Sequence, residues 1–559
     1  MFFAWIVGLL VAGAEDVHPA DEPLQDSVAL EVTQSGMASL GDVAAVLLPS
    51  EPMALDPISQ SGGFSCLNYE FGLQDGEVNL EIQSADLVAG SDKLLVNVDL
   101  MVSINDSANP FVLDYELFCV GEDCPGYVTP FLVEASVPIG LQVITGPDGN
   151  PIFDATLSEP TVVNHLSGDN IILDCNIGTL ETVLDFFGLS LYDLIISAAE
   201  GQIQDAVLDS LGDLEAQLDE ALAQVQVHEE FTFNEATITL DLEPQEVNIT
   251  ETVGMELILA GQATAEPAAC IANYDVGGSL ATPSDLPGLD DLPSGVETAG
   301  LIADDFANRL LYAVWRAGVL CYVVDSDADL GIPINTSLLG ILGGDAFEEL
   351  FPEPAEMVIQ TDPREPPTLV LDDTHDFVVQ AHEIDVNFYG VLDHRMARAL
   401  GVTIDADVGG DLLFDGETGA LDLALDLGAD AIAIRVTGNE LAPAADQVIS
   451  EGMTGLMGTL VDTLLGSALE GLSLQLGSMN GLGLTSMTLG AAGAESDWLM
   501  ASAEIGTVTY GGEGCNSEEG CTGGAEGCDQ GCASGRVGMW PIWGIALPLG
   551  ILVRRRRMV

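Results

Sequence analysis

The chain has 559 residues, enough for about two or three domains, and its 48% hydrophobic content allows a large buried core. It carries 90 acidic against 12 basic residues, a formal net charge of −78. This balance argues against nucleic acid as a partner, because neutralising phosphates requires Lys and Arg. The acidic residues are spread along the chain, which fits adaptation to saline surroundings and leaves calcium binding as an alternative.

Residues 1–14 are predicted to be a signal peptide. An apolar stretch ends in Ala12, Gly13 and Ala14, a small-residue cleavage pattern, although only the amino terminus supplies positive charge before it. We therefore expect an exported protein. Ten cysteines in an exported chain indicate disulfides.

Residues 25–275 are predicted to form a first domain in which strands flank a long helix. Apolar residues alternate at 78–82 and 96–102, and again at 238–242 and 255–259. Between these strands, Thr179 can cap an amphipathic helix. Its apolar positions are Leu180, Val183, Leu184, Phe187, Leu191, Leu194, Ile195 and Ala198, resuming after Gly201 at Ile203, Val207, Leu211, Leu214, Leu218 and Leu222.

Residues 276–299 are rich in Pro, Gly and Asp and are predicted to be a linker. A second domain, residues 300–509, then opens with a helix whose face carries Phe306, Leu310 and Val314, widened by Leu311 and Trp315. Gly318 is expected to end this helix.

Further strands are expected in the second domain, and a second long helix precedes its end. The strands are predicted at 319–324 (buried), 369–371, 384–388 and 421–427, with a hairpin turn in 414–421, and closing strands at 472–476 and 482–489. The late helix has an apolar face of Ile449, Met453, Leu456, Leu460, Val461 and Leu464.

The C-terminal region is predicted to be an anchor. Residues 510–536 form a Gly-rich, acidic stalk with Cys515, Cys521, Cys528 and Cys532, residues 537–553 an uncharged membrane-spanning segment, and residues 554–559 an Arg-rich tail on the inner side of the membrane. This region resembles the C-terminal sorting signals of myxobacteria and their relatives. The resemblance implies processing at Cys532 and display at the cell surface or outer membrane of a bacterium.

Three stretches resemble the bactericidal/permeability-increasing and lipopolysaccharide-binding protein family. The family's "DxFxNxxLxxxxxxGVL" pattern is approached by Asp304, Phe306, Asn308, Leu311, Gly318, Val319 and Leu320. Residues 351–371 resemble its proline-marked strand, with Pro352, Met357, Pro366, Pro367 and Leu369. Residues 28–49 resemble its first strand and helix, in a shorter copy that lacks the Arg.

The resemblance implies an α+β fold of two tubular lipid-binding barrels. Each would be a highly curved antiparallel sheet wrapped around a long helix, and a central sheet would join them into a boomerang. The helix faces would then contact lipid through Leu180, Val183, Leu184, Phe187, Leu191, Leu194, Ile195, Phe306, Leu310, Val314, Met453, Leu456, Leu460 and Leu464.

The expected function is that of a surface-anchored lipid-binding protein that holds phospholipid or another acyl lipid, with lipid transfer as an extension. The alternative is a structural or adhesive surface protein without exchangeable lipid. Periodicity alone favours ordinary core packing as the explanation of the apolar faces.

Two departures from the family are visible. Lys93 is the only lysine, so a Lys-rich and Arg-rich grip on anionic glycolipid is not carried over. The predicted helix from 180 to 225 contains no cysteine, whereas the family joins one there to a strand. We expect instead that Cys119 pairs with Cys124 and Cys270 with Cys321.

The sequence contains no strong catalytic or metal-binding pattern. His375 and His382 are seven residues apart, which places them on opposite faces of a strand, and residues 325–331 lack the Gly and Glu of a complete calcium loop. The sequence has neither a G-x-S-x-G elbow nor a phosphate-binding Gly-Lys loop. We therefore expect no enzyme activity, no cofactor and no bound metal.

Overall fold

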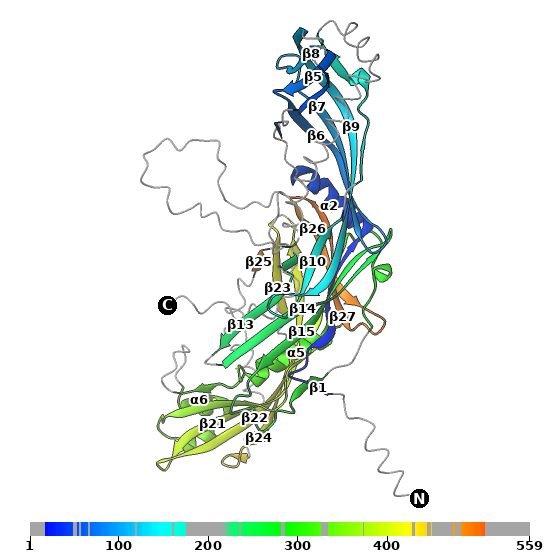
Figure 1. Cartoon of the computed structure of the whole chain (residues 1–559). Coiled ribbons are helices and arrows are strands. Elements are labelled where there is room, and N and C mark those ends of the chain that lie inside the picture. The colour runs from blue at the N-terminus through cyan, green and yellow to red at the C-terminus, as the bar shows by residue number, and fades with distance from the viewer. Residues whose placement is uncertain are drawn as a thin grey trace, which may run out of the picture.

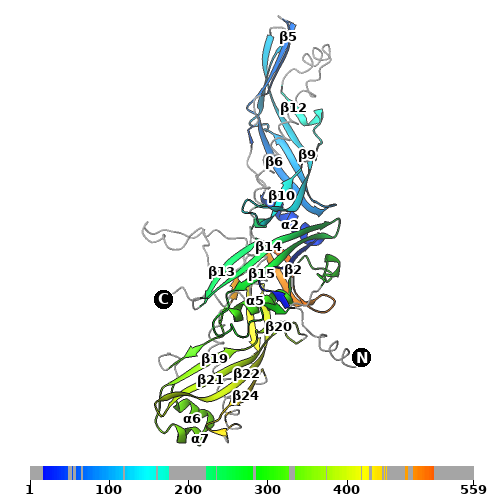
Figure 2. The ribbon, with the colours of Figure 1, turned by 60° about the horizontal axis from the view of Figure 1, so that its bottom comes forward.

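The computed structural model describes most of residues 17–508. Within that range it leaves out 48–52, 55–57, 65–66, 118–119, 159–160, 175–218, 220–221, 224, 234–235, 281–284, 326–333, 373, 417, 427–430, 444–445, 447–448, 450–472 and 476–481. The described part is mostly β, with curled antiparallel sheets in a row along an elongated molecule (Figures 1 and 2).

A ten-stranded sheet forms one end of the molecule, at the top of Figure 1. In β7 buried and half-buried residues alternate without a break, as expected for a strand with one face in the core. The sheet contains β3 (Met53–Ala54), β4 (Ile58–Phe64), β5 (Leu67–Gln74), β6 (Glu77–Ala89), β7 (Leu94–Ile104), β8 (Phe111–Leu117), β9 (Val120–Thr145), β10 (Pro151–Leu157), β11 (Thr161–Asn164) and β12 (Ile171–Leu173), the last preceded by η1 (Gly168–Asn170).

The seven-stranded central sheet brings the beginning, the middle and the end of the described chain together. Its order is β13 (Val227–Phe233), β14 (Ala236–Thr250), β15 (Gly254–Ala265), β2 (Leu24–Thr33), β17 (Thr298–Ala303), β27 (Trp498–Thr507) and β26 (Leu482–Ala492). From the end of β2, helix α2 (Gln34–Leu47) continues the chain to pack against β6 of the first sheet. The central sheet therefore links both halves of the sequence.

The other end of the molecule is an eight-stranded sheet. It contains β18 (Val323–Val324), β19 (Met357–Pro363), β20 (Thr368–Val370), β21 (Phe377–Leu392), β22 (Arg395–Asp415), β23 (Ala420–Asp426), β24 (Ile432–Gly438) and β25 (Ser473–Gln475), with helices α6 (Ser337–Gly343) and α7 (Asp345–Leu350) packed on it. The remaining elements are the pair β1 (Val17–Pro19) and β16 (Gly278–Leu280), η2 (Leu289–Asp291) and helix α5 (Asp304–Arg316).

Most strands predicted from alternation are present, and one is wrong. The hairpin predicted in 414–421 is confirmed, because Asp415 of β22 pairs with Ala420 of β23. The buried strand predicted at 319–324 is mostly a turn, in which the Cys321 N–H donates to the Gly318 carbonyl at 2.9 Å. Only Val323 and Val324 form a strand, and Val323 is 70% exposed. Gly318 has the left-handed backbone conformation and starts this turn, so the chain does not continue from the helix directly into a strand.

The two long helices fall almost wholly outside the described residues, and so do the signal peptide, the stalk and the membrane-spanning segment. A few helical residues are described, at 219 and 222–223 near the predicted end of the first helix and at 446 and 449 near the predicted start of the second; of these, Leu222 and Ile449 are buried. Within the ranges that the structure covers, no helix is long and apolar enough to span a bilayer. The long helix inside each barrel and the boomerang shape therefore stay predictions.

Candidate functional site

Helix α5 lies where the central sheet meets the eight-stranded sheet (Figure 1). Asp304 and Asp305 open its first turn and Arg316 closes its last, which matches the helix dipole. Burial, followed by the charge of Asp305, raises the pKa of Asp304 to about 6. Gly318, at φ +75°, follows the C-cap Ala317, so the predicted end of the helix is confirmed.

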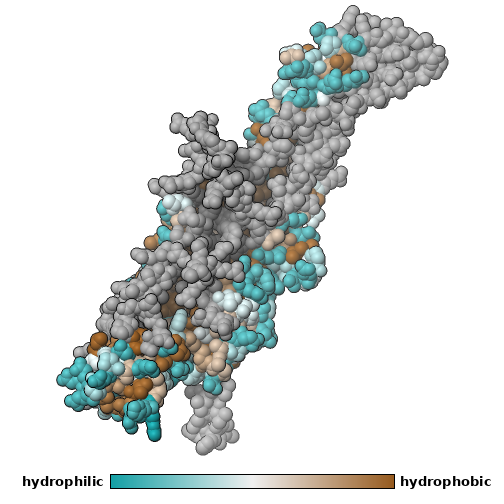
Figure 3. Space-filling view, turned by 90° about the vertical axis from the view of Figure 1, so that its left-hand side faces the viewer, coloured by the Kyte–Doolittle hydropathy of each residue, from teal (hydrophilic) through white to brown (hydrophobic). Residues whose placement is uncertain are grey.

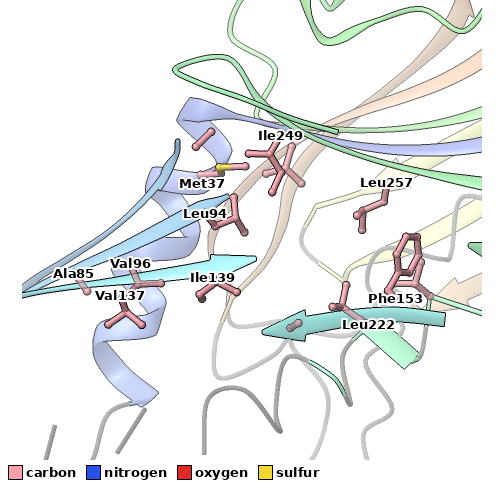
Figure 4. Packing of buried hydrophobic residues seen from close by; sticks show 14 of the residues in the cluster. Met37, Ala85, Leu94, Val96, Val137, Ile139, Phe153, Leu222, Ile249 and Leu257 are labelled. Atoms are coloured by element: carbon pink, nitrogen blue, oxygen red, sulfur yellow. The ribbon is translucent and has the colours of Figure 1, made fainter. Parts of the chain in front are cut away.

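One face of α5 belongs to the apolar interior between the ten-stranded and central sheets, which we call the N-terminal interior. Phe306, Leu310, Ala313 and Ala317 are buried there, with Val314 packed beside them. Figure 4 shows part of this cluster, in which side chains of α2, β7, β9, β10, β14 and β15 point toward one another. Its labelled members are Met37, Ala85, Leu94, Val96, Val137, Ile139, Phe153, Leu222, Ile249 and Leu257.

The adjacent face of α5 belongs to a second apolar interior, which we call the C-terminal interior. Ala307 and Leu311 pack there against Leu369, Phe377, Leu412, Leu421, Leu484 and Ala503. Positions 306 and 310 follow one row along the helix, and 307 and 311 follow the next row. A single helix thus separates two apolar interiors and lines both.

The third face of α5 fixes the helix in place. Tyr312 and Trp315 pack against Ala20 and Ile271, and the Trp315 indole donates to the Pro363 carbonyl at 3.0 Å. A disulfide joins Cys270 to Cys321 just beyond the helix, as predicted. Contacts on this face therefore hold α5 against both halves of the molecule.

Asp275 reinforces that attachment. It accepts hydrogen bonds from the Tyr312 hydroxyl and from Arg316 Nε, the latter at 3.0 Å. Burial acts to raise the pKa of Asp275, but the hydrogen bonds from Tyr312 and Gly277 and the charge of Arg316 outweigh it and hold this pKa below its ordinary value. Asp275 is therefore an ionised anchor for the helix.

Arg309 is a residue whose role the sequence did not reveal. It is 0% exposed although it lies in an amphipathic helix. Its guanidinium donates to the carbonyls of Pro19 and His18 at 2.7 and 3.1 Å, and to His18 Nδ1 at 2.6 Å. Burial lowers its pKa. The sequence does hold one signal for this role: basic residues are rare in this chain, and Arg309 interrupts the apolar face of α5.

Only three of the predicted lipid contacts lie in the described part of the chain. The structure brings Phe306, Leu310 and Val314 together at the N-terminal interior. The positions from 180 to 195 and from 453 to 464 lie outside the described residues. Cys124 is disulfide-bonded, while its predicted partner Cys119 and the predicted processing site Cys532 also lie outside them.

The two histidines at positions 375 and 382 do not form a pair. His375 and His382 face different partners, Asp411 at 3.2 Å and Asp407 at 2.8 Å. In the described ranges, no group of three or more His, Cys, Asp or Glu side chains is arranged to hold a metal ion.

Exposed apolar residues also occur. Figure 3 shows apolar side chains among hydrophilic ones at the lower end of the molecule. Among large apolar side chains, Ile341 of α6 is 76% exposed and Met396 of β22 is 50% exposed. Scattered exposed apolar residues are ordinary, so the two buried interiors beside α5 are the stronger candidate site.

Among known proteins, similarity is found in structure rather than in sequence. No family profile and no curated protein matches the sequence. A crystal structure of lipopolysaccharide binding protein matches with a TM-score of 0.51 and 14% identity, over 87% of this chain and 100% of that chain. The chain therefore shares the fold of that protein.

Two other solved structures show weaker similarity. P47 of Clostridium botulinum E1 matches with a TM-score of 0.24 and 8% identity, over 87% of this chain and 100% of that chain. Takeout 1 of Epiphyas postvittana matches with a TM-score of 0.19 and 12% identity, over 34% of this chain and 86% of that chain. These two scores are too low to add to the fold assignment.

Proposed function

We propose that this protein binds phospholipid or a similar acyl lipid in the apolar interiors on either side of α5. The observation that supports this most directly is the position of α5, whose adjacent faces line two separate apolar interiors. The fold is shared with a protein whose crystal structure is named for lipopolysaccharide binding. Fatty tails are the ligands that such interiors suit.

The chemistry favours hydrocarbon over headgroup recognition. Each buried methylene contributes about 0.8 kcal/mol, so a long acyl chain needs no strong polar contact to stay bound. Three arginines in or beside the eight-stranded sheet are already in ion pairs: Arg364 with Asp385, Arg398 with Glu440, and Arg435 with Glu383 and Asp405. Lipopolysaccharide, with its anionic headgroup, is therefore not the ligand that we propose.

Export and anchoring are part of the same proposal. They rest on the sequence of residues 1–14 and 510–559. Fractionation of the producing cells tests them: the protein should sediment with the envelope and be accessible to protease added outside. Recovery in the cytosolic fraction would contradict this part without affecting lipid binding.

The lipid site is tested by substituting Val314 with Trp. The larger side chain should fill space beside α5 in the N-terminal interior and displace acyl chain. Native mass spectrometry and lipid extraction of the purified chain should show roughly two lipids in the wild type, one for each interior, and fewer in the variant. Val323→Trp, at a position that is 70% exposed, is the matched control and should leave the lipid content unchanged.

A second candidate is a structural or adhesive surface protein without exchangeable lipid. The close packing of the N-terminal interior favours it, because Val102, Val133 and Leu259 are 0% exposed within a single cluster. Extraction of a folded wild-type chain that yields no lipid would support this role and contradict lipid binding. If lipid is present, exchange between labelled and unlabelled vesicles then tests transfer.

A further inference from the structure

The central sheet has a second face, turned away from the N-terminal interior. Along β2, Leu30 and Val32 face the interior, while Ala29 and Glu31 lie on the opposite face. Residues 285–297, which we call the cap segment, cover that face. Leu286, Leu292 and Val296 of the cap segment pack there in one cluster with Ala29 and Trp498.

Glu31 lies in the middle strand of the sheet and has no compensating partner. It is 0% exposed, and its carboxylate oxygens lie beyond ordinary hydrogen-bond geometry from any donor. The side chain that acts on it through a hydrogen bond is another acid, Glu256, and that contact also favours the protonated form of Glu31. Such a group costs several kcal/mol in its charged form. The site therefore favours a neutral, protonated Glu31.

The neighbours of Glu31 make its charged form still less favourable. On β15, Glu256 lies directly opposite in register, and Asp291 of η2 is the second acidic group that acts on Glu31. On β17 the residue opposite Glu31 is Ala299, and Ser502 of β27 lies beyond it. Glu246 of β14 acts in turn on Glu256. The charges around Glu31 thus have the same sign as its own.

The cap segment contacts the acidic cluster near η2. At its end it is held separately, because the Thr33 hydroxyl donates to the Val296 carbonyl at 2.9 Å and the Glu297 carboxylate accepts from the Ser39 hydroxyl at 2.8 Å and the Ile505 N–H at 2.6 Å. The backbone N–H of Leu289 donates to Glu256 of the sheet, and within the cap segment the Gly288 N–H donates to Asp291 at 3.2 Å. On the sheet, Asn248 donates to Glu256 at 3.3 Å. Burial, followed by the charges of Glu256 and Asp291, raises the pKa of Glu31 from 4.5 to about 8. Burial also raises the pKa of Glu256, against the hydrogen bond from Asn248.

We propose that the cap segment is a proton-dependent latch, which closes over the central sheet while Glu31 is protonated and opens once Glu31 loses its proton. The latch is independent of lipid binding, because it lies on the other face of the sheet. Opening hydrates Glu31 and lets it separate from Glu256 and Asp291. Binding or release of a proton at Glu31 therefore sets whether the cap segment is closed or open.

The direction of the pH effect follows from linkage. The pKa of Glu31 is about 8 in the closed form and returns toward 4.5 when the cap opens. The closed form therefore holds one extra proton between these two values, and its stability falls as pH rises. The opening constant should increase roughly tenfold per pH unit in that window and level off above it.

Hydrogen exchange of the full chain tests this. Amides of residues 285–297 are followed from about pH 6 to pH 9, with rates corrected for the intrinsic pH dependence of exchange. The wild type should lose protection in the cap segment by roughly tenfold per unit up to about pH 8. In Glu31→Gln, which cannot ionise, most of this slope should vanish. Glu504→Gln, at an exposed position of β27, is the matched control and should behave like the wild type.

A second variant guards against a simple packing defect. Glu256→Gln removes the charge opposite Glu31 and should move the levelling-off point to lower pH while keeping a slope below it. A wild-type protection that does not change with pH would overturn the latch, and so would an equal slope in Glu31→Gln. Recovery of protection at alkaline pH on adding calcium, in the wild type but not in Glu31→Gln, would also overturn it in favour of a cation site.

Discussion

Gly261 of β15 shows how one residue positions α5. A Cβ atom at this position would lie 2.4 Å from Cε2 of Phe306 and 3.0 Å from Cβ of Ser27. The absence of a side chain therefore lets the Phe306 ring rest on the central sheet. Since Phe306 is itself only 4% exposed, the ring has little room to move away.

Gly261→Ala should destabilise the protein by about 1–3 kcal/mol through overpacking. Chemical denaturation gives the free energy of unfolding. Gly140→Ala on β9, where the nearest atom would be 3.7 Å away, is the control and should change little. Adding Phe306→Leu to the Ala variant should recover part of the loss. Additive effects of the two substitutions would show that the contact is unimportant.

At the scale of the element, α5 is held by covalent and polar contacts at its C-terminal end. The Cys270–Cys321 disulfide closes a loop of 51 residues, and the Ala268 N–H donates to the carbonyl of Arg316 at 2.8 Å. These contacts join the turn after β15 to the end of the helix. These contacts therefore fix the C-terminal end of α5 against the turn after β15.

Replacing Cys270 and Cys321 together by Ser should lower the free energy of unfolding by about 4 kcal/mol in the chain-entropy treatment of a loop of this length. Thermal and chemical unfolding of both proteins in the absence of reductant measure the difference. Ala272→Ser, in the same turn at an exposed position, is the surface control. Equal stability of the double variant and the wild type would show that the other contacts suffice.

At the scale of the whole molecule, the charge is the dominant feature. With a net charge of −78, the folded chain repels itself over distances comparable to the Debye length, about 8 Å at physiological ionic strength. Exposed ion pairs of the described residues, such as Arg398 with Glu440, offset little of this repulsion.

Adding NaCl should therefore raise the unfolding temperature steeply from low salt to about 1 M, because screening relieves the repulsion. Differential scanning calorimetry at fixed pH measures this. KCl at the same ionic strength should have the same effect. An unfolding temperature that does not change, or falls, with salt would show that the acidic surface is not a source of instability.

Most strands and the helix α5 could be predicted from the sequence, but not the distant segments that they pack against. Alternation located β7, β14 and β15, and Gly318 marked the end of α5, because these signals depend on neighbouring residues alone. The strand predicted at 319–324 was wrong, because the residues after Gly318 form a turn that the run of apolar residues does not reveal. Of the candidate site, the apolar face with Phe306, Leu310 and Val314 could be predicted. The burial of Arg309 and Glu31 could not, because it depends on β1 and the cap segment covering them.

By itself, the sequence determined the local structure and the composition of this protein: its strands, the amphipathic α5, its acidity and its apolar stretches. These follow from the period of the hydrophobic residues and from their counts. Only the tertiary structure decided that β2 lies between β15 and β17, and that neighbouring rows of one helix face two interiors. The physical reason is that hydrophobicity specifies which residues leave water, whereas hydrogen bonding and packing between distant segments decide which surfaces they are buried against.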